Sequence, residues 1–384
     1  KKKMKNIYKK HNSFSKIKII KKDNDVDINK IINSLKFEIK NEENITKKDI
    51  FEKIVKDLSK DKDQSESQFK LTPNVVEEIK TIDDKNIGKY LYHRYRYEVF
   101  PKEKILDEFP PYLQIEPTSI CNYRCVFCYQ TDNIFNKKSN NFMGHMTFDT
   151  FKDIIDQIEG KVEFVSLASR GEPLMCKDIE KMLLYTTGKF LNLKINTNAS
   201  MLTEKKIHAV LQSGIKTLVF SADAADEKNY SKLRVNGDLN KILKNKNMFN
   251  QIRDKSYGSS KIITRVSGVK VNEQQNIDEM QSFWGDLVDQ VAFVNYIPWE
   301  NVYDSKEMHV ASPCSDLWRR MFVWWDGKVN PCDVDYKSKL SIEGGIQKNT
   351  ISSIWRSEGY NHLREAHLNE NRAKVDPCNK CNVV

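Results

Sequence analysis

The stretch CNYRCVFC, residues 121–128, places Cys121, Cys125 and Cys128 within eight residues, in the spacing C-x3-C-x2-C. It follows residues 112–116, whose composition is typical of a strand. Three thiolates at this spacing can hold three irons of a cubane cluster and leave the fourth iron without a protein ligand. A structural zinc site needs four ligands, and no fourth Cys or His lies nearby. The open iron would be a place for a substrate or a cofactor to coordinate.

Outward from this loop, strands and helices alternate along the chain. Strands are predicted at 112–116, 162–168, 191–196, 217–221, 261–269 and 291–296. Helices are predicted at 148–158, 179–185, 204–212, within 227–253 and at 277–287. Strands joined by helical crossovers form a parallel sheet with helices outside. The predicted fold class is therefore α/β, a partial (β/α)6 TIM-like barrel, because six units are too few for the eight-fold barrel.

A second group of cysteines lies in the last part of the chain. Its members are Cys314, Cys332, Cys378 and Cys381. Asp326-Gly327 predicts a β-hairpin between 321–325 and 328–332, and a helix is predicted around 351–367. Four thiolates suit either zinc or an iron–sulfur cluster. The residues after 300 are therefore predicted to form a small α+β subdomain that a metal centre holds together.

The first cysteine motif, with Phe127 before its last cysteine, resembles the motif of the radical S-adenosylmethionine (radical SAM) superfamily. The resemblance covers roughly residues 110–300. It implies that the three cysteines hold a 4Fe–4S cluster that binds SAM. It also implies the family's reaction, in which one electron cleaves SAM to methionine and a 5′-deoxyadenosyl radical that abstracts hydrogen from a carbon atom.

The same resemblance assigns SAM-binding residues along the strand ends. Gly171-Glu172-Pro173 matches the family's site for the SAM amino group, and Asn196-Thr197-Asn198 matches its polar strand-end motif. Ser221 and Arg234 match positions that hold the SAM carboxylate, and residues 267–269 match the segment that contacts adenine. An acidic group suits an ammonium and a basic group suits a carboxylate, so the chemistry agrees. The candidate cofactor-binding residues are Phe127, Gly171, Glu172, Asn196, Asn198, Ser221, Arg234 and Val269.

The C-terminal cysteines, with the hairpin and the closing C-x2-C, resemble the SPASM/twitch extension of radical SAM enzymes. Full extensions carry seven cysteines and two clusters, whereas this chain has four, as in the single-cluster form found in aminocyclitol- and sugar-modifying relatives. The resemblance implies one auxiliary 4Fe–4S cluster. Four cysteines would saturate it, which favours an electron-transfer or structural role over substrate binding.

Cys176 belongs to neither group and follows the Gly171-Glu172-Pro173 segment. The first interpretation is a small buried hydrophobic residue, which most free cysteines are. The second is a thiol at the barrel mouth that returns a hydrogen atom to a substrate radical. The second role would make the enzyme an epimerase, so Cys176 is a candidate catalytic residue.

The N-terminal region, residues 1–105, is predicted to be a Lys-rich, mainly helical extension, ahead of the barrel at 106–300 and the cluster subdomain at 301–384. A helix is predicted over 46–58 with Thr46 as its N-cap, and a loop over 61–67. The aromatic and basic stretch 90–100 could bind nucleic acid by stacking, but a helix that packs on the next domain is favoured.

Composition narrows the class of protein further. The 384 residues are 39% apolar and 30% charged, which excludes a collagen-like chain, a disulfide scaffold and a chain disordered throughout. The net charge of +10 resides in residues 1–22, which hold ten lysines and no acid. No apolar run is long enough to span a bilayer, and no secretory signal is found. A cytoplasmic location with reduced thiols is therefore expected.

Taken together, the sequence predicts a radical SAM oxidoreductase or epimerase that acts on a small polar substrate, sugar-like or aminocyclitol-like. The first alternative is a maturase of a ribosomally made peptide, since many SPASM relatives modify peptides. A nucleic-acid-modifying enzyme, suggested only by the basic tail, is favoured least. An electron donor such as flavodoxin or ferredoxin is expected as a partner.

Overall fold

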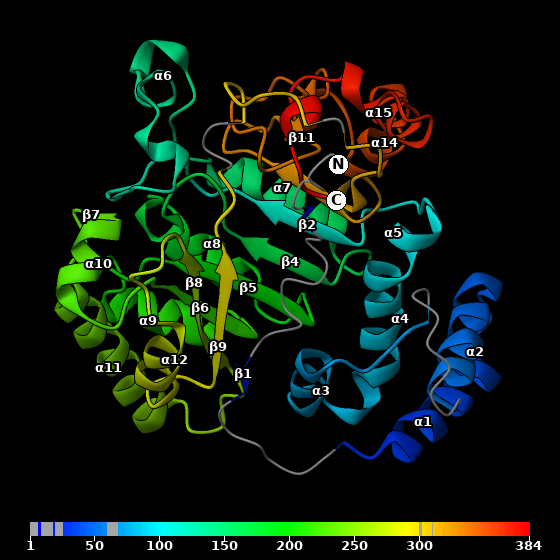
Figure 1. The fold of residues 1–384 in the computed structure, drawn as a ribbon. Helices are drawn as coiled ribbons and strands as arrows, with labels where there is room; N and C mark the ends of the chain where they lie inside the picture. The colour runs from blue at the N-terminus through cyan, green and yellow to red at the C-terminus, as the bar shows by residue number, and fades with distance from the viewer. Residues whose placement is uncertain (1–6, 9–17, 20–25, 60–67, 299–301, 309) are drawn as a thin grey trace.

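A twisted, mostly parallel sheet with helices packed against it forms the centre of the molecule (Figure 1). The computed structural model describes residues 7–8, 18–19, 26–59, 68–298, 302–308 and 310–384. The parallel strands are β2 (Tyr112–Ile115), β4 (Phe164–Leu167), β5 (Asn192–Thr197), β6 (Thr217–Ser221), β8 (Ile263–Lys270) and β9 (Gln290–Asn295). They lie in the order β9-β8-β6-β5-β4-β2, which confirms the predicted partial barrel.

The helices between these strands cover one face of the sheet. They are α7 (Phe148–Ile158), α8 (Ile179–Tyr185), α9 (Glu204–Gln212), α10 (Glu227–Leu233), α11 (Leu239–Ser256) and α12 (Ile277–Gly285). Their apolar faces and the strands share one buried core, which includes Leu113, Ile154, Ile195 and Leu218. Burial of this surface is the main source of the barrel's stability.

The sheet extends beyond the six strands predicted from the sequence. Strand β10 (Arg320–Val323) pairs in parallel with β2, and β11 (Val329–Asn330) pairs antiparallel with β10. Strand β1 (Lys18–Ile19) adds to the other side, on β9. The predicted hairpin is therefore present, but its first strand continues the main sheet. Within the described ranges the sheet stays open, with β1 and β11 as its edges.

The N-terminal region is helical, as predicted, with α1 (Ile28–Asn41), α2 (Ile45–Ser59), α3 (Pro73–Lys80), α4 (Ile87–Glu98) and α5 (Phe100–Glu103). The N-cap prediction for Thr46 is wrong, because α2 begins at Ile45 and the side chain of Asn44 accepts the Lys47 N–H at 3.0 Å. The loop predicted at 61–67 lies outside the described residues.

The aromatic and basic stretch 90–100 packs inward rather than facing solvent. Arg94 and Arg96 are buried, 9% and 3% exposed. Arg94 pairs with Glu98 at 2.7 Å and lies over the Phe164 ring, while Arg96 pairs with Asp107. The favoured interpretation of this stretch as a helix that packs on the barrel is thus confirmed.

The C-terminal region folds over the carboxyl end of the sheet (Figure 1). The single helix predicted around 351–367 is two helices, α14 (Ile351–Trp355) and α15 (Glu358–Leu368), after the short α13 (Gly345–Lys348). The break occurs because Ser357 adopts an extended conformation and caps α15 by accepting the Tyr360 N–H. No helix in the described part of the chain has the length and hydrophobicity needed to span a bilayer.

A buried ion pair joins the barrel to the C-terminal region. The Arg170 guanidinium donates two hydrogen bonds to the Glu116 carboxylate, at 2.8 and 2.6 Å, and both side chains are at most 2% exposed. Arg170 also donates to the Tyr336 carbonyl at 2.9 Å, and Glu116 accepts the Trp325 N–H at 3.2 Å. The pair therefore fixes the ends of β2 and β4 against the chain around β10 and β11.

Arg170→Met should destabilise the protein by about 3–5 kcal/mol, because it leaves the Glu116 carboxylate buried without its cation. Thermal unfolding at equal cofactor loading measures the effect. Lys53→Met is the matched control, since the Lys53–Asp49 pair is about half exposed and should contribute under about 1 kcal/mol. Equal melting shifts for the two variants would contradict this role of the buried pair.

Candidate functional site

A cavity of about 490 Å³ opens at the carboxyl ends of the parallel strands. Cys121, Cys125 and Cys128 line it. So do all the cofactor-binding residues predicted from the sequence, namely Phe127, Gly171, Glu172, Asn196, Asn198, Ser221, Arg234 and Val269. These residues come from five strands and their following loops, and the parallel order of the strands brings them to one place.

The cysteine loop is fixed by a short two-stranded ladder. Strand β3 (Arg124–Cys125) pairs antiparallel with β7 (Arg234–Val235). The Tyr123 N–H donates to Cys121 Sγ at 3.4 Å. Burial raises the pKa of Cys121 to about 12 and raises the pKa values of Cys125 and Cys128 as well. Buried thiols of this kind become thiolates when a metal centre supplies positive charge, so the three residues fit an iron–sulfur cluster.

Glycine is required at position 171 because the backbone approaches the cysteine loop closely. A Cβ on Gly171 would lie 2.4 Å from the Thr118 carbonyl oxygen. This approach lets the Glu172 N–H donate to the Ile120 carbonyl at 2.9 Å. The segment that carries Glu172 is thereby held beside the loop that carries Cys121.

Glu172 is buried at the end of the second parallel strand, and burial raises its pKa. Its carboxylate accepts the Thr197 hydroxyl at 2.6 Å, the Asn198 N–H at 2.6 Å and the Leu174 N–H at 3.1 Å. A carboxylate offers about four acceptor sites, so one remains for a ligand ammonium. The strand-end motif at 196–198 thus positions Glu172 as well as lining the cavity.

Arg234 has a buried partner that the sequence did not indicate. Its guanidinium pairs with Asp223 at 2.6 Å, and Asp223 also accepts the Val269 N–H at 2.6 Å. Arg234 lies 5.7 Å from the Phe127 ring centroid and 3.8 Å from Cys125 Sγ. The pair therefore connects three predicted site residues and aims a cation at the cysteine loop.

The two asparagines of the strand-end motif differ in their surroundings. Asn198 donates to the Asn122 side chain at 3.0 Å, so it braces the cysteine loop. The Asn196 side-chain oxygen forms no hydrogen bond in the described part of the chain and lies at the cavity wall. Ser221 and Val269 line the same wall. These placements leave Asn196 the freer of the two for a ligand.

Cys176 lies away from this cavity. It is 3% exposed and belongs to the core between the sheet and the helices. Its Sγ is 3.8 Å from the Met146 carbonyl oxygen and 4.0 Å from Met182 Sδ. This placement favours the packing role, and it gives no geometric support to the hydrogen-donor prediction.

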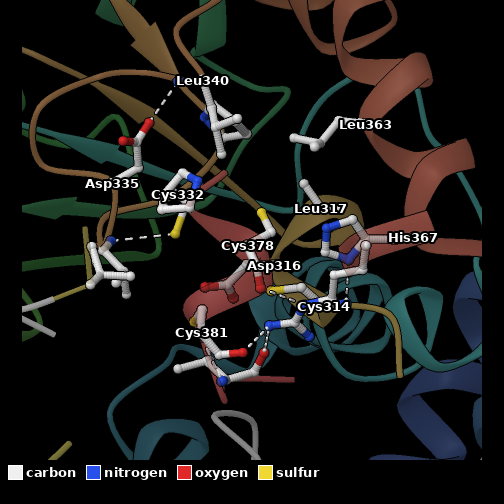
Figure 2. A pocket seen from close by; sticks show the side chains of 16 residues that line it. Cys314, Asp316, Leu317, Cys332, Asp335, Leu340, Leu363, His367, Cys378 and Cys381 are labelled. Carbon is white, nitrogen blue, oxygen red and sulfur yellow. Dashed lines mark hydrogen bonds between the residues drawn. The ribbon is translucent and has the colours of Figure 1, made fainter. Parts of the chain in front are cut away.

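The four C-terminal cysteines surround one hollow (Figure 2). The N–H groups of Val334 and Val383 donate to Cys332 Sγ at 3.3 Å and to Cys381 Sγ at 3.4 Å. Burial raises the pKa of Cys314 to about 11 and that of Cys378 further. Leucine side chains complete the wall, so a buried cluster with four thiolate ligands fits the site.

Two buried side chains hold this second cysteine group, and neither was singled out from the sequence. Arg372, 1% exposed, donates to the carbonyls of Cys378 and Cys381, at 3.2 and 2.8 Å. His367 Nδ1 accepts the Cys314 N–H at 3.1 Å, and burial lowers the His367 pKa to about 3. These hydrogen bonds therefore fix the loops that carry Cys314, Cys378 and Cys381.

Among the described residues, no three or more His, Cys, Asp and Glu side chains converge closely enough to hold one metal ion. The three thiols of the first group line the cavity, and the four thiols of the second group line the hollow of Figure 2.

Comparison with known proteins identifies two regions. Residues 115–261 match the radical SAM superfamily, and residues 314–382 match the SPASM iron–sulfur cluster-binding domain. The chain is 29% identical over 217 residues to a GTP 3′,8-cyclase of Clostridium botulinum (strain Okra / Type B1), which covers 54% of this chain and 64% of that relative. The matched segment thus spans under two thirds of the relative's length.

Two solved structures align with much of this chain, and the first of them shares its fold. Streptococcus suis SuiB, bound to the precursor peptide SuiA, aligns with a TM-score of 0.56 and 15% identity, over 87% of this chain and 86% of SuiB. BtrN, in complex with AdoMet and 2-DOIA, aligns with a TM-score of 0.49 and 20% identity, over 72% of this chain and 94% of BtrN.

Replacing Cys121, Cys125 and Cys128 together by Ala should lower the iron content of anaerobically reconstituted protein from about eight to about four per chain. It should also abolish SAM cleavage. Iron analysis and detection of 5′-deoxyadenosine check both. Replacing Cys332 and Cys378 is the matched control, which should lose iron only from the other site. Zinc at the second site would overturn the auxiliary cluster alone, whereas SAM cleavage by the triple variant would overturn the SAM-binding cluster.

Glu172→Gln and Arg234→Met should each weaken SAM binding by about tenfold to a hundredfold, because each loses a charge-assisted contact of about 1.5–3 kcal/mol. Equilibrium dialysis with labelled SAM measures this on reconstituted protein of equal iron content. Glu204→Gln, in the exposed first turn of α9, is the control. Wild-type affinity in both site variants would show that these residues do not hold SAM.

Proposed function

The chain belongs to the radical SAM superfamily and carries a C-terminal SPASM extension, and from this premise we propose that it abstracts hydrogen from a carbon of a small polar, sugar-like or aminocyclitol-like substrate. The radical SAM domain binds SAM and a 4Fe–4S cluster, and the SPASM domain binds auxiliary iron–sulfur clusters. When bound, the first cluster and SAM supply the 5′-deoxyadenosyl radical.

The size of the cavity carries the choice of substrate class. Its volume of about 490 Å³ falls within the roughly 300–1,000 Å³ typical of small-molecule sites, and it has to hold SAM as well as the substrate, which favours a small substrate. The strand ends, the cysteine loop and residues 333–334 of the C-terminal region line it. The relatives named GTP 3′,8-cyclase also act on a small polar molecule by their name.

The residues of this chain then have separate tasks. We assign Cys121, Cys125 and Cys128 to the SAM-binding cluster, Glu172 to the SAM ammonium and Arg234 to the SAM carboxylate. Phe127 and Val269 would contact the rest of the cofactor. The four C-terminal cysteines would hold the auxiliary cluster. Flavodoxin or ferredoxin as electron donor, and a cytoplasmic location, stay predictions.

Oxidation is favoured over epimerisation. An epimerase must return a hydrogen atom to the substrate radical, and Cys176 lies outside the cavity. An oxidation must remove a further electron and a proton from that radical. Val334 lines both the cavity and the hollow of the second cysteine group, so an auxiliary cluster held in that hollow would be near enough to serve as the electron acceptor.

A peptide maturase is the alternative. SuiB, whose structure contains a precursor peptide, shares the fold at 15% identity, which is a likeness of architecture only. The stretch 90–100 gives no support to a nucleic-acid-modifying enzyme, because Arg94 and Arg96 are buried.

Transfer of deuterium into 5′-deoxyadenosine identifies the substrate class. The reconstituted enzyme is incubated with SAM, dithionite and extract from source cells grown in deuterated medium, divided into a small-molecule and a peptide fraction. Mass spectrometry should find deuterium in 5′-deoxyadenosine with the small-molecule fraction, because the radical takes hydrogen from substrate carbon. Transfer from the peptide fraction alone would overturn the proposal in favour of the maturase.

Cys176→Ala should leave 5′-deoxyadenosine formation and product yield near wild type and cost about 1–3 kcal/mol of stability, because it removes a buried sulfur from the core. Product analysis with the isolated substrate, together with thermal unfolding, checks both effects. A variant that still forms 5′-deoxyadenosine but loses an inverted product would instead establish Cys176 as the hydrogen donor.

A further inference from the structure

The inner part of the cavity is lined by side chains that the SAM-binding motifs do not include. Ser166 of β4 lies opposite Gln114 of β2 and Lys194 of β5 in the sheet. Lys194 precedes Asn196 by two residues on the same face of β5, so it lies about 7 Å deeper in the cavity. Tyr112, at the amino end of β2, lines the cavity deeper still.

Three cationic side chains lie close to the rings of Tyr112 and Tyr97 at this inner end. The Arg320 guanidinium lies 4.6 Å and the Lys194 ammonium 5.3 Å from the Tyr112 ring centroid. The Arg319 guanidinium lies 4.9 Å from the ring centroid of Tyr97. All three cations line the cavity, and Asp333 is the acidic residue that lines it with them on this side.

The positions of the two arginines are fixed from behind. Asp316 pairs with Arg319 at 2.7 Å and lies 3.9 Å from the nearest Arg320 nitrogen. Arg320 donates to the Gln114 side-chain oxygen at 2.9 Å. The guanidinium of Arg320 is therefore oriented before a ligand arrives, which lowers the entropic cost of binding one.

Buried hydrogen-bond donors gather at the inner end. The Tyr112 hydroxyl interacts with the Ser166 hydroxyl and with the Lys194 ammonium, and Tyr112 is 6% and Ser166 1% exposed. Arg320 Nε is buried and forms no hydrogen bond within the described part of the chain. Buried polar groups in folded proteins normally have partners, so a guanidinium N–H left without an acceptor at a cavity wall indicates an acceptor-rich ligand.

The titration of Tyr112 agrees with this arrangement. Burial alone raises the pKa of a tyrosine, yet the pKa of Tyr112 lies below its ordinary value because the charges of Lys194 and Arg320, with hydrogen bonds from Ser166 and Lys194, outweigh the burial. The inner end of the cavity thus favours negative charge.

We infer that Tyr112, Ser166, Lys194 and Arg320 form a subsite for an anionic group of the substrate, a carboxylate or a phosphate. This inference deepens the proposed function and rests on it. The subsite is separate from the place assigned to the SAM carboxylate, since Arg234 lies beside Cys125 on the cysteine loop and pairs with Asp223. An anion held at the inner end would direct the rest of the substrate toward the strand ends, where SAM is expected.

Equilibrium binding of three probes tests the subsite without reductant, so its outcome does not depend on turnover. Glucose 6-phosphate, glucuronate and glucose are titrated into the SAM-loaded, reconstituted protein by calorimetry at fixed ionic strength. At least one anionic probe should bind, and glucose should bind at least about tenfold more weakly, because the donors and cations at the inner end recognise the anion. Whichever of glucose 6-phosphate and glucuronate binds more tightly identifies phosphate or carboxylate as the preferred group.

Substitutions at Lys194 and Arg320 test whether the anionic probe binds at this subsite. Lys194→Met and Arg320→Met should each lower the affinity for the anionic probe by about tenfold or more. Lys194→Arg should recover part of that affinity. Lys205→Met is the control, since the Lys205 side chain is 82% exposed on α9. Iron content and SAM affinity of each variant establish that it has folded.

Three outcomes overturn the inference: glucose binding as tightly as both anions, no binding of either anion to the wild type, or unchanged anion affinity in both Met variants. None of these would affect the proposed hydrogen abstraction, which deuterium transfer tests separately. Conversely, deuterium transfer from peptides alone would overturn the proposed function while leaving a measured anion subsite in place.

Discussion

The fully buried ion pair between Glu116 and Arg170 is the constraint on which the site depends. Glu116 follows β2 and leads to the cysteine loop, and Arg170 follows β4 and immediately precedes Gly171 and Glu172. One bidentate contact therefore sets the relative position of the two segments expected to hold the cluster and the SAM amino group. A buried pair seldom adds net stability over an apolar core, but removal of one partner is costly, so the pair enforces one arrangement.

The Glu116–Arg170 pair also fixes the C-terminal region against the barrel. Its outer contacts, to the Tyr336 carbonyl and the Trp325 N–H, join the barrel to the chain that carries Cys332. The cavity at the first cysteine group and the hollow of the second group consequently share Val334 and Val383 in their walls, although Cys128 and Cys314 are 186 positions apart in the sequence. Two centres in neighbouring spaces suit a reaction that starts with hydrogen abstraction and ends with removal of an electron.

Much of the barrel could be predicted because local signals and the final structure agree. Helices 148–158, 179–185 and 204–212 have the predicted bounds, and Thr147 and Thr203 cap two of them. The pairing of β10 with β2 could not be predicted, since it joins strands about 200 residues apart and depends on packing. Likewise, the cysteines and the strand-end residues could be found from motifs. Asp223, His367, Arg372 and the group around Tyr112 have no local pattern, and only the fold brings them to the site.

The central claim is that the chain holds two different clusters, one with an iron open to SAM and one saturated by four cysteines. Mössbauer spectroscopy of protein reconstituted with ⁵⁷Fe, recorded with and without SAM, tests this claim most directly. SAM should change the signal of about a quarter of the cubane iron at the first site, and leave all iron at the second site unchanged. A spectrum with one cluster type, or with both sites or neither site responding to SAM, would contradict the account.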